Sequence, residues 1–124
     1  MAGVRRFEDL RCWQAARALS VAIENALKAS RCTDHHFISQ LRRAVLSIQT
    51  NIAEGFERYT HNEFHRFLRI AKASAGETRS LLAHASDRGW IDLPLQEQLR
   101  GHAEKVTSLI ARLMRYLREK PHGR

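Results

Sequence analysis

Apolar residues recur along the chain at steps of three and four, the spacing that places them on one face of an α-helix. Four segments show this pattern, covering approximately residues 8–30, 35–54, 62–87 and 94–119. In the first segment the apolar positions are Leu10, Trp13, Ala16, Leu19, Ile23 and Leu27. The connections between segments are short, so neighbouring helices should run antiparallel. The pattern predicts an all-α fold, an antiparallel up-and-down four-helix bundle in one domain that spans residues 1–124.

Helix-terminus signals lie at the breaks between these segments. Asp34 is placed to cap the second helix, and Thr60 with Glu63 forms a capping-box pattern at the start of the third. Gly55 and Gly89 are predicted to end the second and third helices in a left-handed conformation. These signals agree with the boundaries that the apolar spacing indicates.

The composition fits a helical globular protein. Hydrophobic residues make up 44% of the chain and charged residues 27%, with only six glycines and two prolines. The first ten residues lack the apolar core of a secretory signal, and no run of about 18 apolar residues occurs. We therefore expect a cytoplasmic protein without a membrane contact. Cys12 and Cys32 would lie about 30 Å apart along the first helix, too far for a disulfide, so both thiols should be free.

A polar stripe runs beside the apolar face of the second helix, and two polar residues continue the apolar line of the third. The full set is Gln40, Arg43, Ser47, Asn51, Glu54, Ser74 and Glu77. Polar groups so near a core need partners, because a buried unpaired polar group costs about 1–3 kcal/mol. We expect a structural network in which Arg43 pairs with Glu77 or Glu54, and the two amide side chains bond to backbone or serine groups. Such a network would fix which helices pair.

The acidic residues of this set do not indicate an enzyme. Glu54 or Glu77 could serve as a general base, but the sequence supplies no adjacent nucleophile, metal-ligand set or phosphate-binding loop. The chain also lacks the pair of Glu-x-x-His motifs on two helices that binds iron in di-iron bundles. We therefore expect no catalytic residues and no cofactor.

His61 and His65 leave one metal-site alternative open. Their spacing of four residues places both on one face of a helix, where two histidines can bind zinc. The metalloprotease pattern needs glutamate directly after the first histidine, whereas Glu63 lies two residues on. The candidate third ligands are His35 and His36 of the previous helix. On this basis no metal site is predicted.

The chain is strongly basic. Lysine and arginine number 21 against 13 aspartate and glutamate residues, which gives a formal net charge of +8. Basic residues recur at steps of three on the third and fourth helices, and the candidate nucleic-acid contacts are Arg66, Arg69, Lys72, Arg112, Arg115 and Arg118. A solvated face is the ordinary interpretation of such runs. Phosphate contact is the alternative, and it would make binding strongly salt-dependent.

Several short motifs carry a resemblance to a known family. They are Phe7-Glu8-Asp9-Leu10, Trp13-Gln14-Ala15-Ala16, Gln40-Leu41-Arg42-Arg43-Ala44, Ser47-Ile48, Asn51-Ile52-Ala53-Glu54-Gly55, Glu63-Phe64, Phe67-Leu68, Ile70-Ala71, Ser74 and Glu77. With them the chain resembles the bacterial four-helix-bundle proteins encoded in intervening sequences of 23S ribosomal RNA genes. It is also similar to the accessory variability protein of diversity-generating retroelements. Gln49 departs from the pattern, since the family usually has proline there.

The resemblance implies a homopentamer arranged as a barrel around a central channel. From the retroelement relatives it also implies a basic surface that contacts nucleic acid and a reverse transcriptase. We therefore expect a non-enzymatic, oligomeric bundle that binds RNA, DNA or a ribonucleoprotein, with a reverse-transcriptase-like or ribosomal protein as a candidate partner. The alternative is a protein-interaction scaffold with incidental basicity. Trp90 is expected either to cap the end of the bundle or to lie in a subunit contact.

Overall fold

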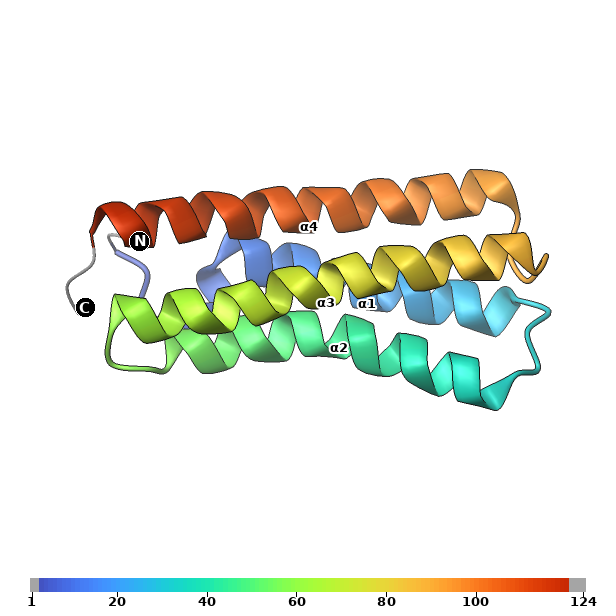
Figure 1. Cartoon of the computed structure of the whole chain (residues 1–124), viewed down its shortest axis with the longest axis horizontal. Helices are drawn as coiled ribbons and strands as arrows, with labels where there is room; N and C mark the ends of the chain where they lie inside the picture. The colour runs from blue at the N-terminus through green and yellow to red at the C-terminus, as the bar shows by residue number, and fades with distance from the viewer. Residues whose placement is uncertain (1–2, 121–124) are drawn as a thin grey trace.

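The computed structural model describes residues 3–120, so residues 1–2 and 121–124 of the expected domain lie outside the described part. A short 3-10 helix, η1 (Phe7–Asp9), precedes four α-helices: α1 (Arg11–Ala29), α2 (His35–Phe56), α3 (His61–Asp87) and α4 (Leu93–Glu119). No strand occurs among the described residues. Consecutive helices run in opposite directions along one long axis (Figure 1). The predicted all-α four-helix fold is confirmed.

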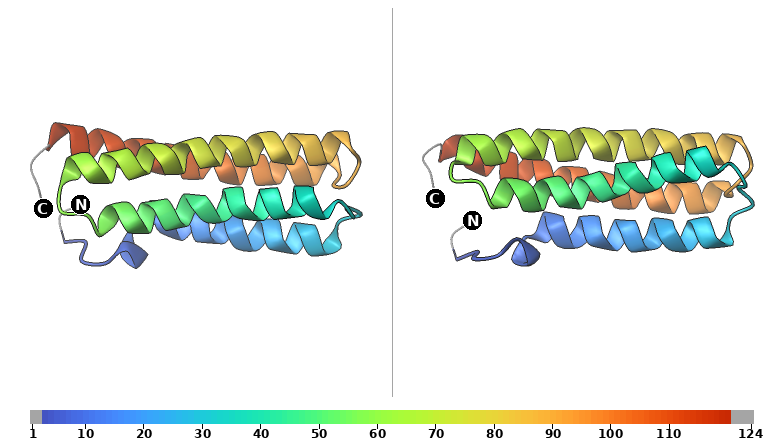
Figure 2. Two further views of the ribbon diagram at one scale, coloured as in Figure 1. Left: turned by 60° about the horizontal axis from the view of Figure 1, so that its bottom comes forward. Right: turned by 90° about the horizontal axis from the view of Figure 1, so that it is seen from below.

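Each α-helix packs against two neighbours. α2 contacts α1 and α3, and α4 contacts α3 and α1, so α1 lies diagonally across the bundle from α3. The rotated views show this four-cornered arrangement, with the helices side by side (Figure 2). The loop between α2 and α3 lies at the same end of the bundle as the last turn of α4 (Figure 1). Segments distant in sequence therefore share this end.

The core forms where the apolar stripes of the helices meet. Every α-helix contributes fully buried residues to it, among them Leu19, Ile48, Leu68 and Ile110. Burying such a side chain stabilises the fold by about 1.5–3 kcal/mol. Thr78 is fully buried as well, and its hydroxyl donates to the backbone carbonyl of Ser74 at 2.8 Å. This bond satisfies the hydroxyl inside the bundle.

The Asp34 cap forms as the sequence indicates, and of the Thr60–Glu63 capping box the half made by the Thr60 hydroxyl is present. The Asp34 carboxylate accepts from the backbone N–H of Phe37 at 3.0 Å, and the Thr60 hydroxyl accepts from that of Glu63 at 3.1 Å. Gly89 has a φ of 76° in the turn after α3, which confirms its role as a left-handed stop. Asp34 and Thr60 thus accept from otherwise unpaired backbone N–H groups at helix starts, and Gly89 turns the chain away from the end of α3.

Gly55 contradicts the prediction made for it. Helix α2 continues through Gly55 to Phe56, so this glycine is not a left-handed stop. The missing side chain of Gly55 allows α2 and α3 to approach each other closely. A Cβ on Gly55 would lie 2.7 Å from Phe67 Cβ and 2.9 Å from Phe64 Cδ1. A glycine beside a loop suggested a stop, but packing against α3 is what requires the missing side chain.

The start of the first helix also differs from the expected boundary. Residues Phe7–Asp9 form the separate turn η1, and α1 begins only at Arg11. Phe7 packs edge-on against Trp13 with ring centroids 5.3 Å apart, which holds η1 against α1. Among the helices of residues 3–120, none combines the length and the apolar character that a membrane span requires.

Candidate nucleic-acid interface

The six predicted basic contacts all lie on the surface. Arg66, Arg69 and Lys72 occupy the N-terminal half of α3, while Arg112, Arg115 and Arg118 occupy the C-terminal half of α4, and every one is exposed. Because α3 and α4 are antiparallel neighbours, these two halves lie at the same end of the bundle (Figure 1). We call this end, which also holds the α2–α3 loop, the basic end.

None of these six side chains forms a salt bridge with another residue of the described part, 3–120. Some arginines nearer the opposite end are paired instead, although Arg31 and Arg88 there form no salt bridge with a described residue. Arg42 binds Glu24 through two hydrogen bonds of 2.9 and 2.7 Å between α2 and α1. The charge of Arg42 is thus offset by an acid, whereas the charges of the basic end face solvent.

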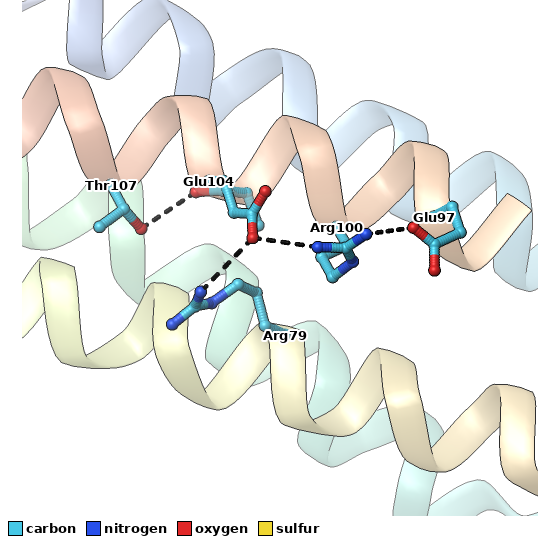
Figure 3. Close-up of polar contacts among 6 residues, drawn as sticks. Arg79, Glu97, Arg100, Glu104 and Thr107 are labelled. Carbon is cyan, nitrogen blue, oxygen red and sulfur yellow. Dashed lines mark hydrogen bonds and ion pairs between the residues drawn. The ribbon is translucent and has the colours of Figure 1, made fainter.

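A second ion-pair group joins α3 to α4 away from the basic end. Arg79 of α3 lies 3.9 Å from the Glu104 carboxylate of α4, and Arg100 contacts the same carboxylate at 3.2 Å (Figure 3). Arg100 also pairs with Glu97 one turn earlier. The Arg79 Nε is buried without a hydrogen-bond partner among the described residues. Arg79 and Arg100 are therefore paired with glutamates of the bundle.

At the basic end, a histidine lies between two of the predicted arginines. Arg118 Nη1 is 3.5 Å from Nε2 of His65 across the α3–α4 contact. Partial burial of the ring, together with the positive charges of Arg118 and Arg69, lowers the pKa of His65 below its usual 6.5. The imidazole is therefore neutral at pH 7, and its Nε2 can accept from the Arg118 guanidinium.

The remaining basic residues spread around the same end. The Arg66 guanidinium lies 4.7 Å from the centroid of the Phe67 ring, a cation–π contact. Arg112 lies on the other side of α4, where it lines a pocket of about 330 Å³ with Arg11 and Tyr116. Sequence reasoning missed Arg11, although its place at the start of the first helix puts it at this end. The candidate surface thus extends from α3 over α4 to α1.

The polar stripe forms only part of the predicted network. The hydroxyls of Ser47 and Ser74 lie 2.9 Å apart and join α2 to α3. Asn51 Nδ2 donates to the Ser47 carbonyl at 2.8 Å and to its hydroxyl at 2.9 Å, as predicted for an amide on this stripe. Ser47 is therefore the centre of the network.

The expected ion pairs of Arg43 are wrong. Glu54 pairs at 2.7 Å with Arg58, which lies in the turn that follows α2. Within residues 3–120 no salt bridge joins Arg43 to Glu77, although both line an open groove of about 490 Å³ between α2 and α3. Gln40 is exposed in the same groove. The long side chains reach solvent, so only the short serines and Asn51 bond near the core.

The histidine pair does not have the geometry of a metal site. His61 is buried and its Nδ1 bonds to the backbone carbonyl of Lys120, which fixes the N–H on that nitrogen. The guanidinium of Arg118 beside His65 would repel a cation. His35 and His36 begin α2, about 30 Å along the helix from the α2–α3 loop, so neither can be the third ligand. Among the described residues no group of three or more metal-binding side chains occurs.

Trp90 lies at the opposite end of the bundle and is half-buried there. Its ring centroid is 4.8 Å from that of Phe37 and 5.7 Å from that of His84. The backbone N–H of Arg31 donates to the Trp90 carbonyl at 3.4 Å. These contacts favour the interpretation that Trp90 caps the bundle, tying the α3–α4 turn to the α1–α2 loop.

Comparison with known proteins agrees with this architecture. Residues 8–112 match the family model of the 23S rRNA-intervening sequence protein. The chain belongs to this family. A crystal structure of a protein of unknown function from the S23 ribosomal protein family of Bacteroides thetaiotaomicron is similar, with a TM-score of 0.75 and 21% identity. The match covers 83% of this chain and 97% of that one, and at this identity it shows a shared fold. No curated protein matches the chain.

Proposed function

We propose that this 23S rRNA-intervening sequence protein is a non-enzymatic cytoplasmic bundle that binds nucleic acid, RNA above all, through arginine and lysine contacts to phosphate. One observation carries the proposal. The five predicted arginines of the basic end, Arg66, Arg69, Arg112, Arg115 and Arg118, are exposed and form no salt bridge with residues 3–120, whereas Arg42, Arg79 and Arg100 are paired with glutamates. Arginine is well suited to phosphate because its planar guanidinium can donate two parallel hydrogen bonds.

The distribution of charge gives the proposal its physical basis. An exposed guanidinium with no acid beside it keeps its donors for a ligand and adds to the positive potential of its surface. Arg69, Arg115 and Arg118 are all exposed at the basic end, so their potentials add there. Phosphate contacts of this kind position a nucleic acid without reading its sequence. The expected ligand is thus recognised by its backbone.

The experiment measures the affinity of a fluorescently labelled RNA hairpin, and of a DNA duplex of the same sequence, by anisotropy. Binding should weaken steeply between about 50 and 200 mM salt, because each phosphate that the protein neutralises releases counterions. Replacing Arg69, Arg115 and Arg118 by glutamine should weaken binding and lower the salt slope by about one for each phosphate no longer neutralised.

A matched control removes the same charge from the opposite end. Lys28, Arg31 and Arg88 are exposed there, and their glutamine triple variant has the same net charge as the test variant. We expect the control to bind nearly as the wild type does. Absence of RNA binding at low salt would contradict the proposed function. Equal weakening by both triple variants would show that net charge, rather than the basic end, governs binding.

A second candidate function is assembly, either of this chain with itself or with a protein partner. Helices α2 and α3 each expose a large apolar side chain, Leu46 with 51% and Ile70 with 41% of their surface accessible. Exposed apolar side chains that gather in a patch mark interaction surfaces. The homopentamer implied by the family resemblance would be one such assembly.

Light scattering at micromolar concentration tests the assembly. The variant Leu46→Glu/Ile70→Glu should lower the measured mass toward that of one chain. Val21→Glu, at an exposed apolar position of α1, is the control and should leave the mass unchanged. A monomeric wild type would contradict the oligomer. For a partner of a different sequence, we propose a ribosomal or reverse-transcriptase-like protein. Such a partner would contact the basic end through bound RNA.

A further inference from the structure

We propose that His65, Arg69 and Arg118 together form a proton-linked phosphate site on the surface where α3 meets α4, which holds one backbone phosphate of a bound RNA. This inference rests on the proposed function and goes beyond it by naming the site and its regulation. His65 is a residue that charge patterning alone would not select, since it is neutral at pH 7. Its position between two cations is what makes it a candidate ligand.

The geometry brings the three side chains together from two helices. Arg118 of α4 lies 3.5 Å from His65 Nε2 through its Nη1. Arg69 lies one helical turn after His65 on α3, and its charge acts on the imidazole. The ring is half-buried, while both arginines are exposed. A phosphate approaching from solvent would therefore meet the two guanidinium groups first and the imidazole behind them.

No described carboxylate forms a salt bridge with either arginine. The charged groups that act on His65 are Arg69 from its own helix and Arg118 from α4, and both are cations. His61 on the preceding turn is occupied by the Lys120 carbonyl. On the α2 side of α3, Arg58 lies over the Phe67 ring. The surroundings of His65 are thus positive, and an anion would relieve the repulsion.

Binding of phosphate would change the hydrogen bonds of His65. In the free protein the neutral Nε2 accepts from Arg118. When a phosphate arrives, the Arg118 guanidinium can donate to its oxygens instead, and Nε2 can take a proton from solvent and donate to the same phosphate. The negative charge favours the protonated imidazole, so binding raises the pKa of His65 from its lowered value. RNA affinity should then increase as the pH falls.

The test compares RNA affinity at about pH 7.5 and about pH 5.5 at constant ionic strength, using the labelled hairpin. Each unit by which binding raises the pKa of His65 adds about tenfold to the affinity at low pH. We expect the wild type to gain about tenfold and His65→Gln to lose that gain. The double variant His35→Gln/His36→Gln is the control, because both residues lie at the opposite end and are exposed. It should keep the gain.

A second measurement needs no RNA. The pKa of His65, followed by NMR of the imidazole, should increase when inorganic phosphate is added. It should also increase in Arg118→Gln, which removes a neighbouring cation, but change less in Arg115→Gln, where the lost charge does not act on His65. These outcomes do not require that His65→Gln folds.

The outcomes separate the two proposals. If RNA binds with the expected salt dependence while His65→Gln keeps the full pH response, the phosphate site is wrong and the proposed function stands. If inorganic phosphate shifts the His65 pKa but RNA does not bind, the site takes free phosphate and the proposed function fails. If phosphate and RNA both leave the His65 pKa unchanged, the inference is overturned.

Discussion

Gly55 of α2 lies so close to Phe67 of α3 that a methyl group on the glycine would be 2.7 Å from Phe67 Cβ. Phe67 Cβ is attached directly to the backbone of α3, so it cannot move without the helix. The glycine therefore sets how closely α2 and α3 approach near the basic end. Alanine is ordinarily a better helix former than glycine, so a loss of stability on replacing Gly55 by alanine would reveal the cost of forcing the two helices apart.

We expect Gly55→Ala to reduce the free energy of unfolding by about 1–3 kcal/mol, since overpacking forces the two helices apart. Gly101 of α4 is the matched control, because a methyl group added there would have no neighbouring atom within 4 Å. Gly101→Ala should increase stability by about 0.5–1 kcal/mol, the usual helix effect. Urea denaturation measures both. Stabilisation by both substitutions would show that the close approach at Gly55 is not required.

The hydroxyl pair Ser47–Ser74 offers a test of the cross-helix network. A double-mutant cycle with Ser47→Ala and Ser74→Ala should give a coupling energy of about 0.5–1.5 kcal/mol, the usual net value of a hydrogen bond. Thr50→Ala is the control, because its exposed hydroxyl bonds only to carbonyls of its own helix. Its coupling to Ser74→Ala should be near zero. A coupling energy of zero between the two serines would show that their hydroxyl pair does not stabilise the pairing of α2 with α3.

The sequence predicted the elements whose signals are local. Apolar residues at steps of three and four indicate a helix because one face must be buried, and the caps at Asp34 and Thr60 act within one turn. Gly55 could not be interpreted correctly in this way. Its role depends on which residue of α3 lies opposite, and that register follows from packing along the whole length of both helices.

The candidate site shows the same division. Steps of three placed Arg66, Arg69 and Arg118 on helix surfaces, and the antiparallel arrangement that follows from short loops places those surfaces at one end. The contact between Arg118 and His65 depends on the exact rotation of α4 against α3. Likewise, Arg43 was expected to pair with Glu77 or Glu54, but Glu54 pairs with Arg58 of the turn that follows α2. Long charged side chains have several partners within reach, and spacing alone does not choose among them.

The two cysteines should react at very different rates. Burial raises the pKa of the Cys12 thiol to about 12, while Cys32 is half-buried in the α1–α2 loop. Because the thiolate is the reactive form, the buried Cys12 should be much slower than Cys32 toward an aromatic disulfide reagent at pH 8. We expect one thiol of the native chain to react fast with the reagent, and both thiols to react fast in denaturant. Cys32→Ser should remove the fast reaction of the native protein. A fast reaction that persists in this variant would place Cys12 at the surface.

The lowered pKa of His65 also predicts a pH dependence of stability. Unfolding frees His65 from Arg118, Arg69 and partial burial, so its pKa returns to about 6.5 in the unfolded chain. Between that value and the lower folded pKa, the unfolded state binds more protons than the folded state. The contribution of His65 to stability is therefore constant above the unfolded pKa and declines as the pH falls below it.

We expect the wild type to lose more stability than His65→Gln when urea denaturation is moved from about pH 7.5 to about pH 5.5. Comparison of the two removes the contributions of the other histidines, which both proteins share. Arg118→Gln should show an intermediate loss, because one of the two cations is gone while burial and Arg69 remain. Saturating inorganic phosphate should reduce the loss in the wild type, since an anion bound beside His65, Arg69 and Arg118 favours the protonated ring. An equal decline in the wild type and His65→Gln would mean that burial and the two arginines together do not lower the pKa of His65 in solution.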